Sequence, residues 1–314
     1  MISHVGLKKI ITDLRWSIRQ IPYIIHANNI NCYLDVPACD NKVNIFDYQP
    51  NKSGFENILF QNEPYNLGDY LGRVICRWIL NKENKDIDVW IPKKKHLFTV
   101  GSNILGSELK GNYQDATIWG SGILFQPSKK IILFQKLSRR KLDIRAVRGP
   151  LTRNILLRMR FSCPTIYGDP AILMPLIYNP PIKKEKRPYS IVLQFYHERI
   201  FRKEHPNEYM ISMNTKDYKS VIDEIVASEV IYTSSLHGII LAEAYGVPAV
   251  FFRGLGKNID FKYLDYYYST GRREIKIAES FEEALTMKPL PLPDLTKMRQ
   301  DLLDSFPYDL WDNK

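Results

Sequence analysis

Residues 229–252 read EVIYTSSLHGIILAEAYGVPAVFF, and the prediction of the fold rests on them. Residues 230–232 are apolar and mostly β-branched, which predicts a short buried strand. Ser235 can cap a helix, and apolar side chains then recur at helical spacing over residues 237–245. A glycine and a proline follow, which end the helix, and residues 249–252 predict a second strand. The stretch is therefore a β-loop-α-β unit.

His237 lies where the first strand of this unit passes into the helix. The free backbone N–H groups and the positive end of the helix dipole meet at such a point and attract anions. Gly238 lets a ligand approach the backbone closely. Because histidine exchanges a proton near neutral pH, we take His237 as the candidate catalytic residue.

The length and charge of the chain limit its organisation and its partners. A chain of 314 residues exceeds what one core usually organises, so we expect two domains. We place the boundaries at residues 1–178, 179–288 and 289–314, the last being a helix that docks back on the body. The 44 Lys and Arg residues outnumber the 34 Asp and Glu residues, giving a net charge of +10. This favours anionic partners, and nucleic acid, phosphorylated metabolites and a lipid surface stay open.

The cysteines and apolar runs indicate the compartment. The four cysteines show neither CxxC nor metal-ligand spacing, as in a reduced cytoplasmic protein. No carboxylate cluster has metal spacing either, so we assign no metal-binding residues, and whether a metal assists the reaction stays open. No apolar run is long enough for a membrane-spanning helix, and charges interrupt the N-terminal apolar residues, so we expect no signal peptide. We therefore expect a cytoplasmic protein.

Residues 7–21 form a basic amphipathic pattern. This pattern predicts a helix half-buried on its own domain. The same pattern fits peripheral contact with the inner membrane face, and that alternative stays open.

Other segments carry weaker signals. The pieces 131–134 and 189–195 are apolar and read as strands. Residues 253–273 read as a loop in which tyrosines alternate with cations. Such tyrosines either pack against the protein or stack on nucleobases and sugars.

Polar and glycine-rich motifs follow several expected strands in the first half. They suit loops that meet at the carboxyl edge of a parallel sheet, where α/β proteins bind ligands. Arg148 precedes Gly-Pro at a helix start, where its guanidinium can bind phosphate or carboxylate. In chain order the motifs are Asn66-x-Gly68-Asp69, Gly101-Ser102, Trp119-Gly120-Ser121-Gly122, Arg145-x-x-Arg148-Gly149-Pro150 and Gly168-Asp169-Pro170.

Together with Ser235-Leu236-His237-Gly238 and Gly246-Val247-Pro248, these motifs resemble the polysaccharide pyruvyl transferase family. The resemblance covers about residues 65–252. It implies an α/β fold of two Rossmann-like domains facing a central cleft, similar to GT-B enzymes, with parallel sheets flanked by helices. It also implies transfer of the enolpyruvyl group of phosphoenolpyruvate onto a pair of sugar hydroxyls as a ketal, in bacterial exopolysaccharide or capsule biosynthesis.

The resemblance also implies partners and site residues. Phosphoenolpyruvate is then a co-substrate, no cofactor is expected, and the acceptor is a glycan, whether free or lipid-linked, rather than a nucleic acid. Residues 1–178 would form the acceptor side and supply Arg148, and residues 179–288 the donor side with His237 as catalytic residue. The resemblance places Arg148 and the segment Leu236, His237 and Gly238 at the donor. We add Ser235, Arg145 and Lys262 as further donor-binding candidates. The acceptor and cleft residues would be Asn66, Gly68, Asp69, Gly101, Ser102, Gly120, Ser121 and Asp169.

Ser235 stands where many members of the family have arginine. Arg145, Arg253 or Lys262 could replace that cation, or the serine hydroxyl and backbone N–H groups could suffice alone. Two other functions stay open. A GT-B glycosyltransferase could hold a nucleotide sugar with the aromatic segment 253–273, and a basic chain could bind nucleic acid, although it lacks a recognised motif.

Overall fold

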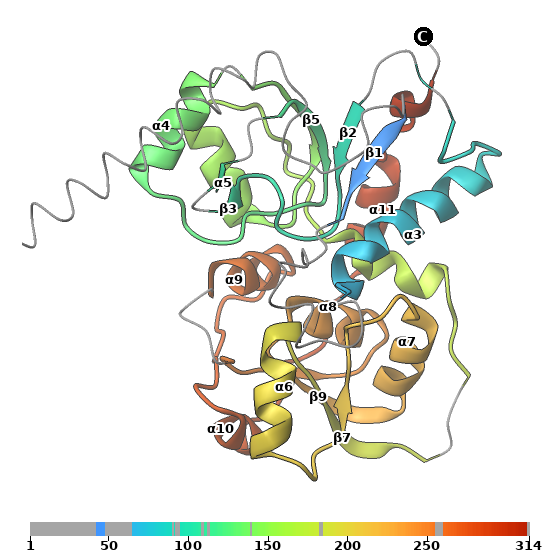
Figure 1. Cartoon of the computed structure of the whole chain (residues 1–314), viewed down its shortest axis with the longest axis vertical. Coiled ribbons are helices and arrows are strands. Elements are labelled where there is room, and N and C mark those ends of the chain that lie inside the picture. Colours follow the sequence, from blue (N-terminus) through green and yellow to red (C-terminus); the bar gives the residue numbers. More distant parts are fainter. Residues whose placement is uncertain are drawn as a thin grey trace, which may run out of the picture.

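The computed structural model describes residues 42–47, 65–89, 91, 95–107, 110–111, 114–138, 140–181, 185–254 and 260–312. In Figure 1 the first half of the chain forms the upper body and most of the second half forms the lower body. Each body is built on a parallel sheet flanked by helices. The expected α/β class with parallel sheets is therefore confirmed.

The first sheet has the order β1-β2-β5-β6, and all its strands are parallel. Its strands are β1 (Val43–Phe46), β2 (Lys95–Phe98), β5 (Ala116–Trp119) and β6 (Leu142–Ala146). The helices of this half are α3 (Leu67–Lys82), α4 (Lys129–Leu137) and α5 (Pro150–Arg158). Two short strands, β3 (Gly106–Ser107) and β4 (Lys110–Gly111), pair antiparallel outside the sheet.

The second sheet has the order β10-β9-β7-β8, again all parallel. Its strands are β7 (Arg187–Val192), β8 (Met210–Ile211), β9 (Ser228–Thr233) and β10 (Ala249–Phe251). Its helices are α6 (Phe195–Glu204), α7 (Tyr218–Val226), α8 (Leu236–Ala244), α9 (Asp260–Ser269) and α10 (Phe281–Thr286). The chain leaves β7 toward β8 and later returns to its other side with β9. The direction of the strand order therefore changes between β7 and β9, where α/β sheets bind ligands.

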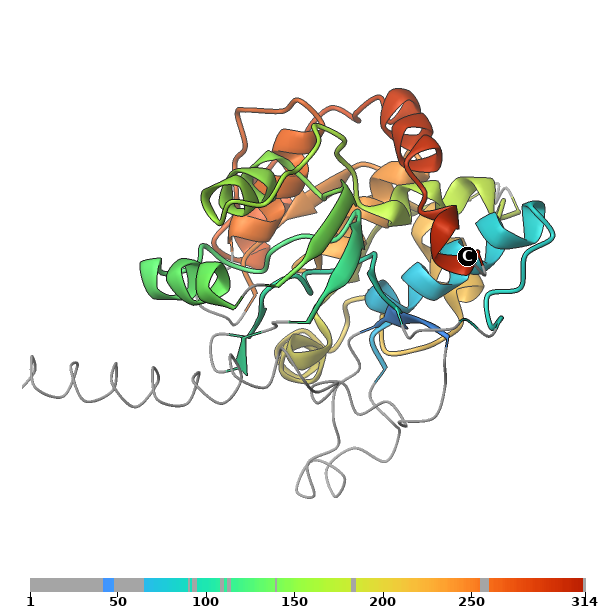
Figure 2. The same ribbon diagram turned by 90° about the horizontal axis from the view of Figure 1, so that it is seen from above.

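The two halves share a hydrophobic core. The 3₁₀ helix η1 (Pro170–Leu176) lies between them and packs against both α3 and α8. One cluster of buried apolar side chains runs from β1 and α3 through η1 into α8. The C-terminal elements α11 (Thr296–Asp304) and η2 (Tyr308–Trp311) return to the first half; in Figure 2 they are the red helices on the same side of the molecule as α3.

The β-loop-α-β unit is present as expected, in β9, α8 and β10. Ser235 is the N-cap of α8, and its Oγ accepts a hydrogen bond from the Gly238 N–H at 3.4 Å. Gly246 has a φ of +74°, the left-handed conformation that ends a helix.

The strand expected at residues 131–134 is wrong, because this segment lies in α4. Ser128 caps that helix by accepting a hydrogen bond from the Ile131 N–H at 3.3 Å. The buried side chains are Ile132 and Gln135, three positions apart, which is helical rather than strand spacing.

Two further boundaries differ from the sequence-based expectation. The strand expected at residues 189–195 ends at Val192, and Phe195 already begins α6. The loop expected at 253–273 contains the ten-residue helix α9. Three of its tyrosines, Tyr263, Tyr266 and Tyr267, are buried, so their packing keeps this segment helical.

The amphipathic segment 7–21 lies outside the described residues. The domain boundaries and the central cleft stay predictions. Within the described ranges, no helix combines the length and the apolar character that crossing a bilayer requires.

Candidate functional site

Loops that follow strands of the two sheets contact each other, and the candidate site residues lie in or next to these loops. Arg148 follows β6 of the first sheet and contacts Asp265 of α9 in the second half. Gly68, at the start of α3, lies against His237 at the start of α8. The loops that follow the strands of both sheets therefore meet in one region.

His237 lies in the first turn of α8 and is 9% exposed. Its Nε2 atom is 3.7 Å from Oδ2 of Asp169, and Asp169 is fully buried. Among the described residues neither of these two atoms has a hydrogen-bond partner. The other carboxylate oxygen of Asp169 accepts from the Ala171 N–H at 3.0 Å, which fixes the side chain at the start of η1. A buried acid and an imidazole thus lie side by side with uncommitted atoms, as at a proton-transfer site.

The motif at the start of α3 joins the two parts of the site. A methyl group on Gly68 would lie 1.9 Å from Nδ1 of His237, so only glycine fits there. A methyl group on Gly101 would lie 2.3 Å from Oδ1 of Asp69, so Asp69 lies against the loop after β2. Asn66 is the N-cap of α3, although its side chain makes no cap hydrogen bond.

Arg148 is fully buried, and other parts of the protein bind its guanidinium. Its Nε donates to Asp265 at 3.2 Å, and its two terminal nitrogens donate to Ser102 Oγ at 2.7 Å and to the Ile123 carbonyl at 2.6 Å. Gly122 leaves room for it, since a methyl group there would lie 2.3 Å from the guanidinium carbon. Arg148 therefore holds the loops after β2 and β5 together.

The N-terminus of α5 already has an anion. Oδ1 of Asp265 accepts from the Thr152 N–H at 2.9 Å, and Oδ2 accepts from the Thr152 hydroxyl at 2.7 Å. Gly149, the N-cap, has no side chain and so permits this approach of α9. Burial raises the pKa of Asp265, while Arg148 and Thr152 act in the opposite direction. The helix terminus expected to bind a ligand anion beside Arg148 is occupied here by a protein carboxylate.

Ser235 stands where many family members have arginine, and three basic residues were candidates to replace that cation. Their surroundings differ. Arg145 is paired with Asp143 and Asp309. Arg253 is paired with Asp260 and Glu279. Lys262, in the first turn of α9, has no such partner among the described residues, and its ammonium lies 4.9 Å from the centre of the Tyr263 ring.

The charges of two other site residues, Arg148 and Asp69, act on Lys262. Burial and, second, the charge of Arg148 lower its pKa to about 8, and the charge of Asp69 opposes both. Burial also lowers the pKa of His197, and the second cause is the charge of Lys262. His197 is a residue that sequence reasoning missed. It lies in the first turn of α6, which the sequence reading assigned partly to a strand.

Some candidate residues have structural tasks. Leu236 is a core residue, and Gly238 is needed for packing because a methyl group there would lie 2.3 Å from Thr233 Oγ1. Ser121 Oγ donates to the Gly101 carbonyl at 3.2 Å. Gly120 has a φ of +84° and packs against Pro170. These contacts hold the loops that carry Ser102 and Asp169.

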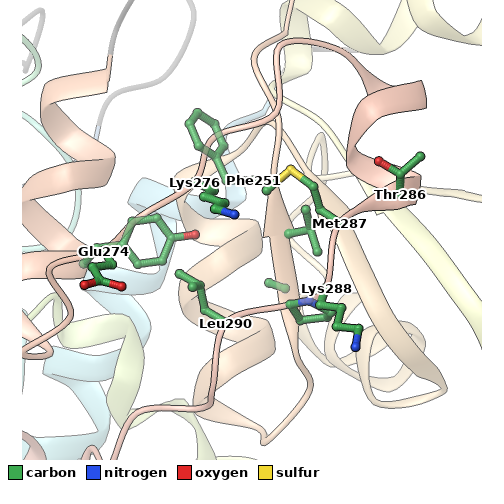
Figure 3. A pocket seen from close by; sticks show the side chains of 11 residues that line it. Phe251, Glu274, Lys276, Thr286, Met287, Lys288 and Leu290 are labelled. Atoms are coloured by element: carbon green, nitrogen blue, oxygen red, sulfur yellow. The ribbon is translucent and has the colours of Figure 1, made fainter.

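A separate pocket of about 460 Å³ lies along the outer strand β10 (Figure 3). Its apolar lining includes Phe251 and Leu290, and the charged residues Glu274, Lys276 and Lys288 of the lining are exposed. None of the candidate site residues lines it. Across the described part of the chain, no group of three or more His, Cys, Asp or Glu side chains could hold a metal ion.

Comparison with known proteins gives a family for the chain. A model of the polysaccharide pyruvyl transferase family matches residues 64–254, which include the start of α3, Arg148, Asp169, His197 and His237. The chain belongs to the polysaccharide pyruvyl transferase family. It is also similar to an uncharacterized protein of Acanthamoeba polyphaga mimivirus, with 27% identity over 176 residues. That alignment covers 52% of this chain and 57% of the relative, so the chain matches little more than half of the relative's length.

Proposed function

We propose that the protein transfers the enolpyruvyl group of phosphoenolpyruvate onto two hydroxyls of a glycan as a cyclic ketal. The observation that carries this proposal is the buried pair of His237 and Asp169, whose facing atoms have no hydrogen-bond partner among the described residues. The pair lies within the segment that matches the family. The expected setting is exopolysaccharide or capsule synthesis, and a lipid-linked acceptor fits the same chemistry.

The reaction needs one proton at carbon and a leaving phosphate. Protonation of the donor methylene gives a methyl group and an oxocarbenium-like centre, which one sugar hydroxyl attacks. The C–O bond to phosphate then breaks, and the second hydroxyl closes the ring. Of the two hydroxyl protons, one replaces the proton given to the methylene and the other leaves with the phosphate as HPO₄²⁻. An acid near the donor methylene is therefore required.

His237 is the proton donor in this proposal. Its Nε2 atom makes no hydrogen bond to a described residue, so the N–H at this position is available for transfer. Nδ1 lies against Gly68, which fixes the ring plane. Asp169 acts as a positioning residue, because its carboxylate faces the ring at 3.7 Å and holds it in place electrostatically without binding the proton that is transferred. General acid catalysis by a positioned histidine typically contributes about 10²–10⁴-fold in rate.

The test is an assay with phosphoenolpyruvate and a panel of sugar acceptors. We expect one phosphate released per acceptor modified, and a mass increase of the acceptor that corresponds to a pyruvate ketal. His237→Gln should abolish the turnover and leave donor binding measurable by calorimetry. Full turnover by that variant would remove His237 from the mechanism, and release of phosphate without a ketal product would reject the transfer itself.

The GT-B glycosyltransferase alternative depended on aromatic residues in the segment 253–273. Tyr263 stacks on Phe251 with ring centres 3.9 Å apart, and Tyr266 donates to Glu243 at 2.8 Å. Both rings are buried in the protein interior, so they are not available to stack on a nucleobase.

A further inference from the structure

Three basic side chains lie in the first turns of three helices near the β7–β9 crossing point. They are His197 in α6, His237 in α8 and Lys262 in α9. A cation at this end of a helix is unfavourable, because the helix dipole and the free N–H groups are already positive there. Carboxylates would stabilise these positions, so the basic residues are better explained by an anion that binds among them.

Hydrogen bonds hold the three first turns together. The Gln194 side-chain amide donates to the Ser234 carbonyl at 3.0 Å and to the Tyr263 hydroxyl at 2.6 Å. The Tyr263 hydroxyl in turn donates to the same Ser234 carbonyl at 2.6 Å. Gln194 directly precedes α6, Ser234 precedes the N-cap of α8, and Tyr263 follows Lys262 in α9. The basic residues therefore sit on a rigid frame that brings the helix starts together.

His197 has the surroundings of a ligand-binding imidazole. Its Nδ1 is buried and has no hydrogen-bond partner among the described residues. Gly254 packs on that atom, since a methyl group there would lie 2.2 Å from Nδ1. No hydrogen bond of its Nε2 to the described part of the chain is present either. The ring is half-buried: its buried Nδ1 lacks a described partner, and its Nε2 is free to donate to a ligand.

Lys262 is the cation of this cluster that lacks an ion pair among the described residues. Arg148 is neutralised by Asp265 and Arg253 by Asp260 and Glu279, whereas Lys262 has no ion pair within the described ranges. Asp69 is the carboxylate whose charge acts on Lys262, and Arg148 and His197 are its basic neighbours. Burial is the main cause of the lowered pKa of both Lys262 and His197, and the charge of Lys262 is the second cause for His197.

We propose that His197 and Lys262 together bind the phosphate group of the donor, next to His237. This inference rests on the proposed function, because it takes the donor to be an enol phosphate. A phosphate dianion can accept hydrogen bonds from an imidazole, an ammonium and a helix N-terminus at once, whereas one carboxylate would balance Lys262 alone. Lys262 lies beyond residues 64–254, so this part of the site is outside the segment that matches the family.

The experiment measures binding of inorganic phosphate and of phosphoenolpyruvate by calorimetry. We expect Lys262→Met and His197→Gln each to weaken both ligands at least 10-fold, and Lys262→Arg to retain most of the affinity. The matched controls are Lys276→Met, an exposed lysine of the outer pocket, and His205→Gln, the other histidine near α6; both should bind like the wild type. Unchanged affinity in the two site variants overturns the inference, as does wild-type protein that binds neither ligand at millimolar concentration.

The two proposals can fail separately. Loss of phosphate binding in the site variants, with no ketal product from the wild type, supports the anion site and rejects the proposed reaction. Ketal formation by the wild type, with unchanged phosphate affinity in the variants, supports the proposed reaction and rejects the anion site. If a variant does not fold, acetylation of Lys262 in the wild type replaces it, followed by peptide mass spectrometry across pH. Phosphate should shift the half-reaction point of Lys262 upward from about pH 8, and no shift overturns the inference.

Discussion

At the scale of single residues, Asp169 and His237 approach each other without forming a hydrogen bond. We expect Asp169→Asn to reduce kcat about 10–100-fold, because the amide keeps the cap to Ala171 but loses the charge facing Nε2. The Kd for phosphoenolpyruvate should change little. Steady-state kinetics combined with calorimetry checks this separation. An equal loss of kcat and donor affinity would show that Asp169 binds the donor rather than positions His237.

For Lys262 we predict that removing the charge increases the stability of the folded protein. Its pKa in the folded protein lies below its ordinary value of 10.5, at about 8. The folded state therefore binds this proton less tightly than the unfolded state, a cost fully present below pH 8 and absent above about pH 10.5. We expect Lys262→Met to raise the free energy of unfolding at pH 7 by about 1–3 kcal/mol in phosphate-free buffer.

Urea unfolding at pH 7 and pH 10.5 measures this difference. The gain should vanish at the higher pH, and Lys276→Met should show no gain at either pH because its side chain is exposed. A variant less stable than the wild type at pH 7 would mean that charged Lys262 stabilises the folded protein without ligand, which contradicts the prediction.

At the scale of elements, the start of α3 positions the imidazole. Gly68→Ala would place a methyl group 1.9 Å from Nδ1 of His237, and Gly72→Ala, one turn later, would place one 2.1 Å from Thr99 Oγ1. Both variants should lose stability through crowding, by about 1–3 kcal/mol. Only Gly68→Ala should lose turnover as well, by at least 10-fold. The comparison uses initial rates at saturating donor and thermal unfolding, and equal rates in both variants would contradict it.

The sequence predicted elements well where signals for start, period and end agreed. The β9-α8-β10 unit has a cap, an apolar run and a left-handed glycine, and it was predicted correctly. The strand predicted at residues 131–134 is wrong because a short apolar run does not distinguish a strand from a helix. The overlooked signal is Ser128, which caps the helix. In α9, buried tyrosines overrode a composition that looked like a loop.

The part of the site that local sequence signals mark could be predicted, and the part that depends on contacts between distant segments could not. His237 could be found because its own flanking residues mark a helix start. The contacts of Arg148 with Asp265, and the proximity of His197 to Lys262, join segments far apart in the sequence. Such pairs depend on how loops of the two sheets meet, and no local pattern encodes that.

At the scale of the whole molecule, the Arg148–Asp265 pair links the two halves and is fully buried. Removing one partner of a buried ion pair leaves an unpaired charge, so Arg148→Met should lower the free energy of unfolding by about 3–5 kcal/mol. The double variant with Asp265→Leu should be more stable than the sum of the single effects indicates, since no lone charge remains. A denaturant double-mutant cycle measures this coupling. Additive effects would contradict the coupling between Arg148 and Asp265. A stable Arg148→Met protein that no longer binds the donor would show that Arg148 binds the ligand, as the sequence suggested.

The return of α11 to the first half has a consequence for how the protein is made. The indole of Trp119 donates to the carbonyl of Leu302 at 2.9 Å and meets the ring of Phe306 edge-on at 5.0 Å. While the ribosome is still translating the second half, β5 has left the exit tunnel but its covering helix has not been synthesised. The nascent chain must therefore keep an aromatic surface exposed until residues 296–311 emerge, and that interval is when chaperones would be most needed.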